Sequence, residues 1–368
     1  MARKIQLGIL FGGRSAEHEV SLQSARNVIE ALDPDKYDLT LIGIDQQGRW
    51  FLNEASRFLL EARQPELYRL HEAGPALVLI PGSEGPQLVC ADNMNRLPVL
   101  DVAFPVLHGT YGEDGAVQGL LKMAGIPCVG SDILGSAVGM DKDVMKRLLR
   151  EAEIPTPRFC TLHAAHRDQI QLTAVLEALG GFPIFVKPAN LGSSVGIHKV
   201  KCEADWLPAL EDAFSFDHKL VVEQGLTCRE IECSVLGNAH PRASVPGEVV
   251  VQAEFYSYEA KYISADAARL EIPARLAPEL AERIQQLAIQ TFEVLNCQGL
   301  ARVDFFLTPE QEVYVNEVNT LPGFTRISMY PKLWEASGLS YRALLDQLIQ
   351  LALDKARQDR NLRTRYHA

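Results

Sequence analysis

The sequence predicts an α/β protein that begins with a doubly wound parallel sheet. Short apolar runs typical of buried strands alternate with runs of helical periodicity as far as about residue 135. A Gly-Gly turn follows the first run, where a strand would pass into a helix. The chain has 368 residues, of which 47% are hydrophobic and 23% charged, which favours a globular protein with more than one domain.

The first unit is assigned to residues 1–138. Its expected elements are a strand at 4–13, a helix at 15–32, strands at 37–44 and 99–109, a helix at 113–125 and a closing segment at 126–131. Ser15 is the candidate N-cap of the first helix. Between Arg49 and Asn95 we expect loops, a helix near residues 53–62 and a hairpin near residues 76–91.

Two further units are assigned to residues 139–224 and 225–368. The second is expected to begin with a helix that is ended by Pro155 and Pro157. Its later elements are a helix and a strand within 170–189, a strand and a helix within 197–215, and a strand at 219–226. The third runs from a strand at 229–237 through several more strands to an amphipathic helix at 341–357.

Composition narrows the class of protein. The net charge of −11 argues against a nucleic-acid or anionic-membrane partner. No window approaches about eighteen apolar residues, so no membrane-spanning helix is expected. The seven cysteines form no C-x-x-C pair, which is typical of reduced thiols in a cytoplasmic protein. The usual P-loop and the G-x-G-x-x-G fingerprint are both absent.

The segment FVKPANLGSSVGI, residues 185–197, joins a strand ending near Lys187 to a loop of glycine and serine. Glycines let backbone amides approach an oxygen-rich ligand, and serine hydroxyls add hydrogen-bond donors. A phosphate-binding loop is therefore one interpretation, and an ordinary turn between strands is the other.

A hairpin within residues 300–320 predicts a metal site. With a two-residue loop at Glu310–Gln311, Asp304 faces Glu317 across the two strands. In the same register Arg302 faces Asn319, and all four side chains share one face. Carboxylate and amide oxygens suit Mg²⁺, which binds one or two carboxylates plus phosphate oxygens. A solvent-facing polar surface with a salt bridge is the alternative, and a bulge would shift the register.

The turn after this hairpin offers a second polar group. Pro322–Gly323 forms a rigid turn with a backbone N–H free to donate. Together with Arg302, such an amide near a metal–phosphate site makes an oxyanion hole. A plain turn is the alternative.

Five segments in order resemble one known family. They are FGGRSAEHEVSLQSA, PVLHGTYGEDGAVQG, VKPANLGSSVGI, FYSYEAKY and RVDFF…VNEVNTLPGFT, and they span residues 11 to 330. From these motifs the chain is similar to the ATP-grasp superfamily and, more narrowly, to the D-alanine–D-alanine ligase family. The resemblance implies an ATP-grasp fold, in which an N-terminal doubly wound parallel-sheet domain is followed by two α+β lobes that hold ATP between them.

The resemblance also implies a reaction. One D-alanine carboxylate attacks the γ-phosphate of ATP to form D-alanyl phosphate, and the amine of a second D-alanine displaces the phosphate. The products are D-alanyl-D-alanine, ADP and phosphate, for peptidoglycan synthesis. Two Mg²⁺ ions are implied, for which Mn²⁺ is expected to substitute, and a homodimer is expected.

Residue by residue, the resemblance implies a nucleotide site. Lys142, Lys187 and Lys261 resemble phosphate lysines, with Ser193 and Ser194 in the covering loop. Glu223 and Gln224 resemble the adenine-binding hinge, and Glu230 the ribose contact. Asp304, Glu317 and Asn319 match the magnesium ligands. Relatives often have Lys and an aromatic residue where this chain has Gln224–Gly225, so the chain departs from the family pattern at the adenine contact. For Lys142 the alternative is a surface charge on a helix.

The resemblance implies an amino-acid site as well. Glu17 resembles the residue that holds the first ammonium group, and His108 a substrate-site histidine. Arg302 and Gly323 match the oxyanion contacts, and Ser328 and Met329 match positions for the second carboxylate. Ser193 and Tyr262 would join Glu17 in a hydrogen-bonded triad. Structural roles for Glu17, as a charge near a helix N-terminus, and for His108, at a strand end, are the alternatives.

Tyr262 lies in a polar, aperiodic segment, residues 254–274, that is interpreted as a lid. Its tyrosine favours a dipeptide product, since relatives that make D-alanyl-D-lactate tend to carry histidine there. A related ligase that joins D-alanine to D-lactate or D-serine is the second reading. A non-catalytic ATP-binding module is the third, and the retained magnesium ligands and Arg302 weigh against it.

Overall fold

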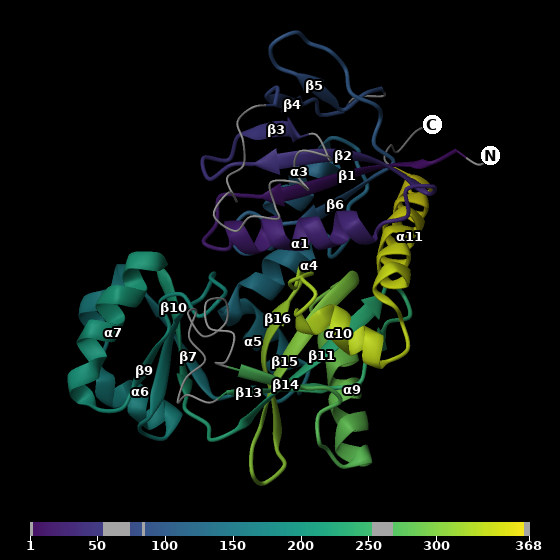
Figure 1. Ribbon diagram of the computed structural model, residues 1–368. Helices are drawn as coiled ribbons and strands as arrows, with labels where there is room; N and C mark the ends of the chain where they lie inside the picture. Colours follow the sequence, from purple (N-terminus) through teal and green to yellow (C-terminus); the bar gives the residue numbers. More distant parts are fainter. Residues whose placement is uncertain (1–2, 54–73, 83–84, 252–267, 364–368) are drawn as a thin grey trace.

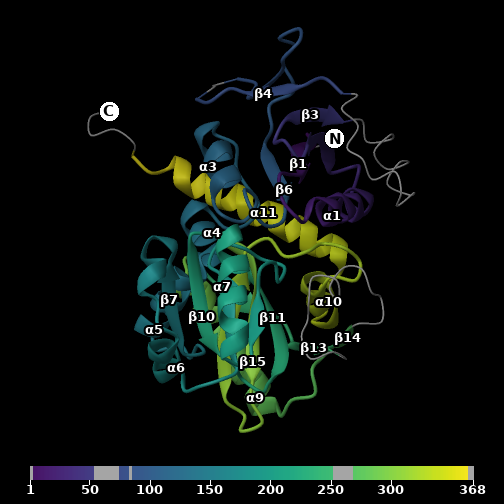
Figure 2. The same ribbon diagram turned by 90° about the vertical axis from the view of Figure 1, so that its left-hand side faces the viewer.

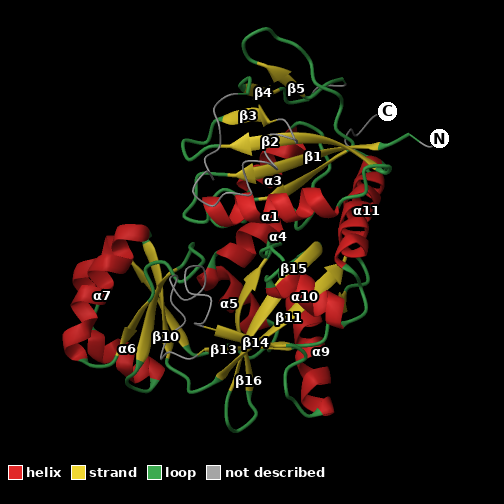
Figure 3. Cartoon of the chain, viewed as in Figure 1, coloured by secondary structure: helices red, strands yellow, loops and turns green. Residues whose placement is uncertain are grey.

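Three sheets form the framework of the protein, and a different stretch of chain builds each one (Figure 1). The structure is a computed structural model that describes residues 3–53, 74–82, 85–251 and 268–363. Helices pack on the sheets, so the mixed α/β class predicted from the sequence is confirmed (Figure 3). Within the described ranges, no helix is both long and apolar enough to cross a membrane.

The first sheet has the strand order β3-β2-β1-β6. Its parallel strands are β1 (Ile5–Gly12), β2 (Tyr37–Ile44) and β6 (Val102–Val106), and the antiparallel edge is β3 (Trp50–Asn53). Helix α1 (His18–Ala31) covers the face that carries Leu7 and Ile9. Helix α3 (Ala116–Met123) covers the face that carries Leu10. The sheet is therefore doubly wound, as expected.

Some of the details expected for this unit are confirmed by the structure and others are not. The N-cap of α1 is Glu17, and the Ser15 hydroxyl instead accepts a hydrogen bond from the backbone N–H of Glu17 at 3.1 Å. The closing segment forms only an isolated bridge between Cys128 and Ala103. The hairpin near residues 76–91 is present as β4 (Leu77–Leu79) and β5 (Leu88–Cys90). The helix expected near residues 53–62 lies almost wholly outside the described residues.

The second sheet is antiparallel, with the order β7-β10-β8-β9. Its strands are β7 (Phe159–His163), β8 (Ile184–Pro188), β9 (His198–Val200) and β10 (Lys219–Gln224). Helices α6 (Leu172–Leu179) and α7 (Glu203–Phe216) pack on it through one apolar core. Two helices precede this sheet, α4 (Ile133–Met140), which the sequence did not indicate, and α5 (Lys142–Glu151), which ends before Pro155.

The third sheet runs in the order β14-β13-β11-β15-β16, with β12 paired to β11. Its strands are β11 (Arg229–Gly237), β12 (Arg242–Ala243), β13 (Gly247–Val251), β14 (Ala268–Glu271), β15 (Gly299–Leu307) and β16 (Val313–Asn319). Helix α9 (Pro278–Val294) buries one face against Val303 and Phe305. The opposite face of β15 and β16 carries the polar residues, because side chains alternate along a strand.

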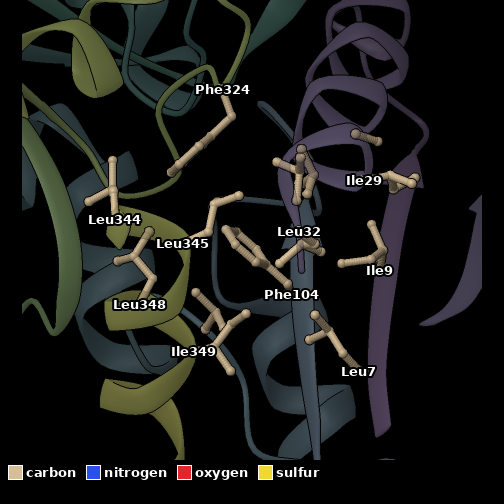
Figure 4. Close-up of a cluster of buried hydrophobic side chains, with 14 of the residues drawn as sticks. Leu7, Ile9, Ile29, Leu32, Phe104, Phe324, Leu344, Leu345, Leu348 and Ile349 are labelled. Atoms are coloured by element: carbon tan, nitrogen blue, oxygen red, sulfur yellow. The ribbon is translucent and has the colours of Figure 1, made fainter. Parts of the chain in front are cut away.

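The last helix, α11 (Tyr341–Arg360), returns to the first unit (Figure 2). Leu344 and Leu348 lie in one core with Leu7 and Phe104 of the first sheet (Figure 4). Asp346 adds polar contacts, accepting from Lys36 at 2.6 Å and from the Tyr37 hydroxyl at 2.7 Å. The two ends of the chain therefore share one core, which ties the first sheet to the third.

A second tie between these parts is the carboxylate of Asp132. It caps α4 by accepting from the backbone N–H of Ile133 at 2.8 Å, and it pairs with Lys122 of α3 at 2.5 Å and Lys355 of α11 at 3.1 Å. Partial burial raises the pKa of this carboxyl, but the hydrogen bonds and both lysines outweigh burial and lower the pKa from 3.8 to about 2.

Asp132→Asn is expected to lower the free energy of unfolding by about 1 kcal/mol at pH 7, because it removes a charged cap and two ion pairs. Since folding lowers the pKa of Asp132, its contribution is present above about pH 4 and is lost as the pH falls through about 2. Urea unfolding at pH 7 and pH 3 should show the difference shrinking. Equal stability of the variant and the unmodified protein at pH 7 would contradict this account. Asp92→Asn, at an exposed site, is the control and should leave the free energy of unfolding unchanged.

Candidate functional site

The β15–β16 hairpin brings together the four polar residues predicted for the metal face. Asp304 lies opposite Glu317, and Arg302 lies opposite Asn319. The side chain of Asn319 donates to Asp304 at 3.0 Å. The predicted register of these four residues is confirmed, so two carboxylates and an amide share one face of the third sheet.

The route to this register differs from the prediction. Thr308 and Glu312 still pair by a backbone hydrogen bond of 3.0 Å, so the predicted two-residue loop is wrong. The longer loop turns through Gln311, whose φ of 63° lies in the left-handed region. Beyond the loop, Asn316 is an extra residue of β16, because Phe305 pairs with Val315 while Asp304 pairs with Glu317. This β-bulge restores the register at the carboxylates.

Arg302 is held between two carboxylates. It donates to Asp304 from Nε and Nη2, both at 2.7 Å, and its Nε lies 2.8 Å from Glu232 of β11. Burial lowers the pKa of the guanidinium, but Asp304 and Glu232 raise it well above its ordinary value. Glu232 was not predicted, although its position opposite Asp304 on β11 places it on the same face.

Two of the predicted phosphate lysines reach this face from other elements. Lys142, the first residue of α5, lies 3.3 Å from Glu317 and donates to the carbonyl of Leu191 at 2.7 Å. Lys187, near the end of β8, pairs with Glu223 of β10 at 2.8 Å. Both lysines are buried, so the surface-charge alternative for Lys142 is wrong.

A third lysine in this group was not predicted. Lys146 of α5 is 0% exposed, lies 3.2 Å from Glu223 and donates to the carbonyl of Asn316 at 3.2 Å. Burial lowers the pKa of Lys146, and Glu223 opposes that effect. Burial raises the pKa of Glu223, but Lys146 and Lys187 outweigh burial and lower it, so the carboxylate is ionised.

The Gly/Ser loop folds against the first unit. Ser193 and Ser194 have φ values of 53° and 59°, in the left-handed region that non-glycine residues rarely occupy. The Ser193 hydroxyl donates to Glu17, which closes one side of the predicted triad. Gly109 makes room for this contact, because a Cβ there would come within 2.8 Å of the Glu17 carboxylate.

His108 is buried and lies close enough to Glu17 to feel its charge. Its Nδ1 contacts the carbonyl of Leu321 at 2.9 Å, and its Nε2 contacts the Ser24 hydroxyl at 3.1 Å. Burial lowers the pKa of His108, but the neighbouring carboxylates of Glu113, at 3.8 Å, and of Glu17 raise it overall. Glu113 was not predicted, although it lies in the same HGTYGEDG segment as His108.

The turn after β16 lies beside the other predicted amino-acid contacts. The Cα of Gly323 is so close to Ser328 that a Cβ at Gly323 would lie 2.8 Å from the Ser328 hydroxyl. Ser328 is the N-cap of α10 (Met329–Ala336). The side chain of Met329 is buried in a small core with Val249 and Leu333, so only the backbone of Met329 is suited to bind a carboxylate at this helix N-terminus.

The remaining predicted residues are Lys261, Tyr262, Gln224 and Glu230. Lys261 and Tyr262 lie outside the described residues. The side chain of Gln224 accepts from Arg158 at 2.6 Å, which directs it toward the edge of the second sheet. Glu230 lies on β11, opposite Phe306 of β15.

The described residues fit a magnesium–phosphate site better than a metal cage made by protein alone. Asp304 and Glu317 offer hard oxygen ligands on one face. Among the described residues, no three His, Cys, Asp or Glu side chains come close enough to hold a metal by themselves. Phosphate oxygens would complete such a site, and Lys142 beside Glu317 is placed to bind them.

The chain matches known proteins over nearly its whole length. Profiles described as D-ala D-ala ligase N-terminus and C-terminus match residues 6–131 and 148–350. A D-alanine–D-alanine ligase A from Chromobacterium violaceum is 55% identical over 359 residues, covering 98% of each chain. The solved structure of the Coxiella burnetii D-alanine–D-alanine ligase is 40% identical, with a TM-score of 0.84 over 98% of this chain and 97% of that one.

A third relative has a different substrate in its name. The crystal structure of the VanG D-Ala:D-Ser ligase from Enterococcus faecalis is 36% identical, with a TM-score of 0.84, and covers 95% of this chain and 100% of that one. The three sheets and the polar face between them define a ligase of the ATP-grasp class. More narrowly, the chain belongs to the D-alanine–D-alanine ligase family.

Glu317→Gln is expected to reduce turnover by about a hundredfold or more while sparing the fold, because a neutral amide is a poorer magnesium ligand than a carboxylate. Steady-state kinetics and thermal unfolding would be measured on the same preparation. Glu312→Gln, at the exposed end of the same hairpin, is the matched control and should keep full activity. Turnover of the Glu317 variant close to that of the unmodified protein would disprove the metal assignment.

Proposed function

We propose that this chain joins two molecules of D-alanine, with ATP as the co-substrate, to give D-alanyl-D-alanine, ADP and phosphate. Membership of the D-alanine–D-alanine ligase family supports the reaction. The observation that carries it in this chain is the convergence of Lys142, Glu317, Asp304 and Arg302 on one face. A phosphorylated carboxylate formed there would lie beside cationic side chains and beside the carboxylates that are proposed to bind the metal.

In the first half-reaction, the proposed role of Lys142 and Lys187 is to bind the phosphates of ATP. Glu223 and Gln224 would bind adenine, and Glu230 the ribose. Ser193 and Ser194 would donate to the phosphates from the covering loop, together with Lys261. The carboxylate of the first D-alanine would then attack the γ-phosphorus and form D-alanyl phosphate, with ADP leaving.

Glu17 is proposed to hold the ammonium group of the first D-alanine. The Ser193 hydroxyl bonds to Glu17 in the structure, and Tyr262 would complete this triad. His108, which is buried between Glu113 and Ser24, would contact substrate from the same side. These contacts fix the amino acid while its carboxylate reacts.

In the second half-reaction, the amine of the second D-alanine would attack the carbonyl carbon of D-alanyl phosphate. Arg302 and the backbone N–H of Gly323 would stabilise the oxyanion of the tetrahedral intermediate. Ser328 and the backbone of Met329 would bind the carboxylate of the second D-alanine at the N-terminus of α10. Collapse of the intermediate releases phosphate and leaves the dipeptide.

Magnesium is proposed as the metal, held by Asp304, Glu317 and Asn319. Two ions are expected, with Mn²⁺ able to substitute. Bound there, the metal would neutralise charge on the transferring phosphate. The cytoplasmic location, the homodimer and the unit boundaries of residues 1–138, 139–224 and 225–368 remain predictions of the same proposal.

A second candidate joins D-alanine to D-serine or D-lactate. The observation that supports this candidate is the similarity of the chain to the VanG D-Ala:D-Ser ligase. Higher identity over the full chain to relatives named D-alanine–D-alanine ligase favours D-alanine as the second substrate.

The test measures phosphate release from Mg-ATP with D-alanine, with L-alanine and with no amino acid, together with the mass of the product. ADP and D-alanyl-D-alanine are expected to form together, with D-alanine only. Parallel reactions with D-serine or D-lactate beside D-alanine identify the second substrate. Phosphate release that does not depend on D-alanine would overturn the ligase proposal, and a mixed product formed in preference to the dipeptide would favour the second candidate.

A further inference from the structure

Two lysines share the same pair of partners in the nucleotide site. Glu223 contacts Lys146 through Oε1 at 3.2 Å and Lys187 through Oε2 at 2.8 Å. The backbone carbonyl of Asn316 accepts a hydrogen bond from Lys146 at 3.2 Å, and the side-chain oxygen of Asn316 accepts one from Lys187 at 3.4 Å. One carboxylate therefore lies between two ammonium groups. The four residues come from four different elements, α5, β8, β10 and β16.

The two lysines differ in what surrounds them. Lys146 is 0% exposed, and its contacts are made by Glu223 and Asn316 within the protein. Lys187 is 6% exposed and lies at the end of β8, immediately before the Gly/Ser loop. Its ammonium group also lies 5.8 Å from the centre of the Phe306 ring. Lys187 is thus the member of the pair that can turn toward a ligand, and Lys146 is the member that stays.

We propose that Lys146 is a positioning residue, which keeps Glu223 neutralised and in place when Lys187 turns from this carboxylate to the phosphates of the nucleotide. The inference rests on the proposed binding of ATP. A buried carboxylate that loses its only cation is strongly destabilised. With Lys146 present, Glu223 keeps one ion pair throughout. Without it, Lys187 would have to serve either Glu223 or the phosphates.

The test is a double-mutant cycle on Lys146 and Glu223, read by the affinity for ADP in calorimetry. Lys146→Met is expected to weaken ADP binding about tenfold and to raise the KM for ATP by a similar factor. The KM for D-alanine should change by less than about twofold, because Lys146 acts on the nucleotide side. In the Glu223→Gln background, adding Lys146→Met should have little further effect, since a glutamine needs no counter-charge.

A structural role alone gives a different pattern. It would lower the unfolding temperature and reduce ADP affinity by the same factor in both backgrounds. That result would overturn the proposal, as would a Lys146→Met variant that binds ADP like the unmodified protein. If Lys146→Met does not fold, the comparison of Glu223→Gln with the double variant decides, because neither buries an unpaired carboxylate. A tenfold difference between those two would count against the proposal, and equal affinity would support it.

Failure of this inference is separable from failure of the proposed function. ADP binding and dipeptide formation by the unmodified protein test the proposed function, and the variants test only the role of Lys146. ADP binding and dipeptide formation without coupling between Lys146 and Glu223 would leave the ligase reaction standing and remove only the role of Lys146.

Discussion

The site depends on one extra residue in a β-strand. Asn316 bulges from β16, and this brings Glu317 opposite Asp304 and Asn319 opposite Arg302. Without the bulge, the register set by the hairpin loop would carry through, and the side chains of Glu317 and Asn319 would alternate to the face that packs on α9. The same residue supplies the acceptors for Lys146 and Lys187. A single local irregularity therefore organises both the metal face and the lysine group.

Charge balance explains why so many ionisable groups can be buried here. Arg302 is paired with Asp304 and Glu232, Lys142 with Glu317, and Lys146 and Lys187 with Glu223. Each group gains a partner that offsets part of the cost of leaving water. These pairings also hold lysines, which suit phosphate oxygens, beside carboxylates, which suit a metal ion. A nucleotide and metal bound there would bring their own charges, and the lysines would exchange carboxylate partners for phosphate oxygens.

The arrangement of the units follows from how the chain ends. Helix α11 packs its leucines into the core of the first sheet, although it follows the third sheet in sequence (Figure 4). His108 and Ser24 of the first unit contact Leu321 and Phe324, which come directly after β16. The first unit is therefore fixed to the turn that carries Gly323. Ser193 meets Glu17 from the second unit, so residues from all three sheets meet around one site.

Strong periodic patterns made much of this predictable from the sequence. The parallel strands of the first sheet follow from apolar runs. The pairing of Asp304 with Glu317 was predicted with a loop one residue too short, and the unpredicted bulge at Asn316 offsets that error. The hairpin loop was misjudged because Gln311 adopts a left-handed conformation that its residue type does not signal. The short strand β3 carries too few residues to show a period. In the sequence, Lys146 has the pattern of a solvent-exposed charge on a basic helix. Its contact with Glu223 of β10 depends on the tertiary structure and leaves no signal in the sequence.

The central claim is that the face carrying Asp304, Glu317 and Asn319 binds the metal that accompanies ATP. The most direct measurement is a crystal structure with ADP and Mn²⁺, with diffraction data collected near the manganese absorption edge. We expect an anomalous peak within coordination distance, about 2.0–2.6 Å, of carboxylate oxygens of both Asp304 and Glu317. Manganese bound elsewhere, with Asp304 still paired to Arg302 and Glu317 still paired to Lys142, would contradict it.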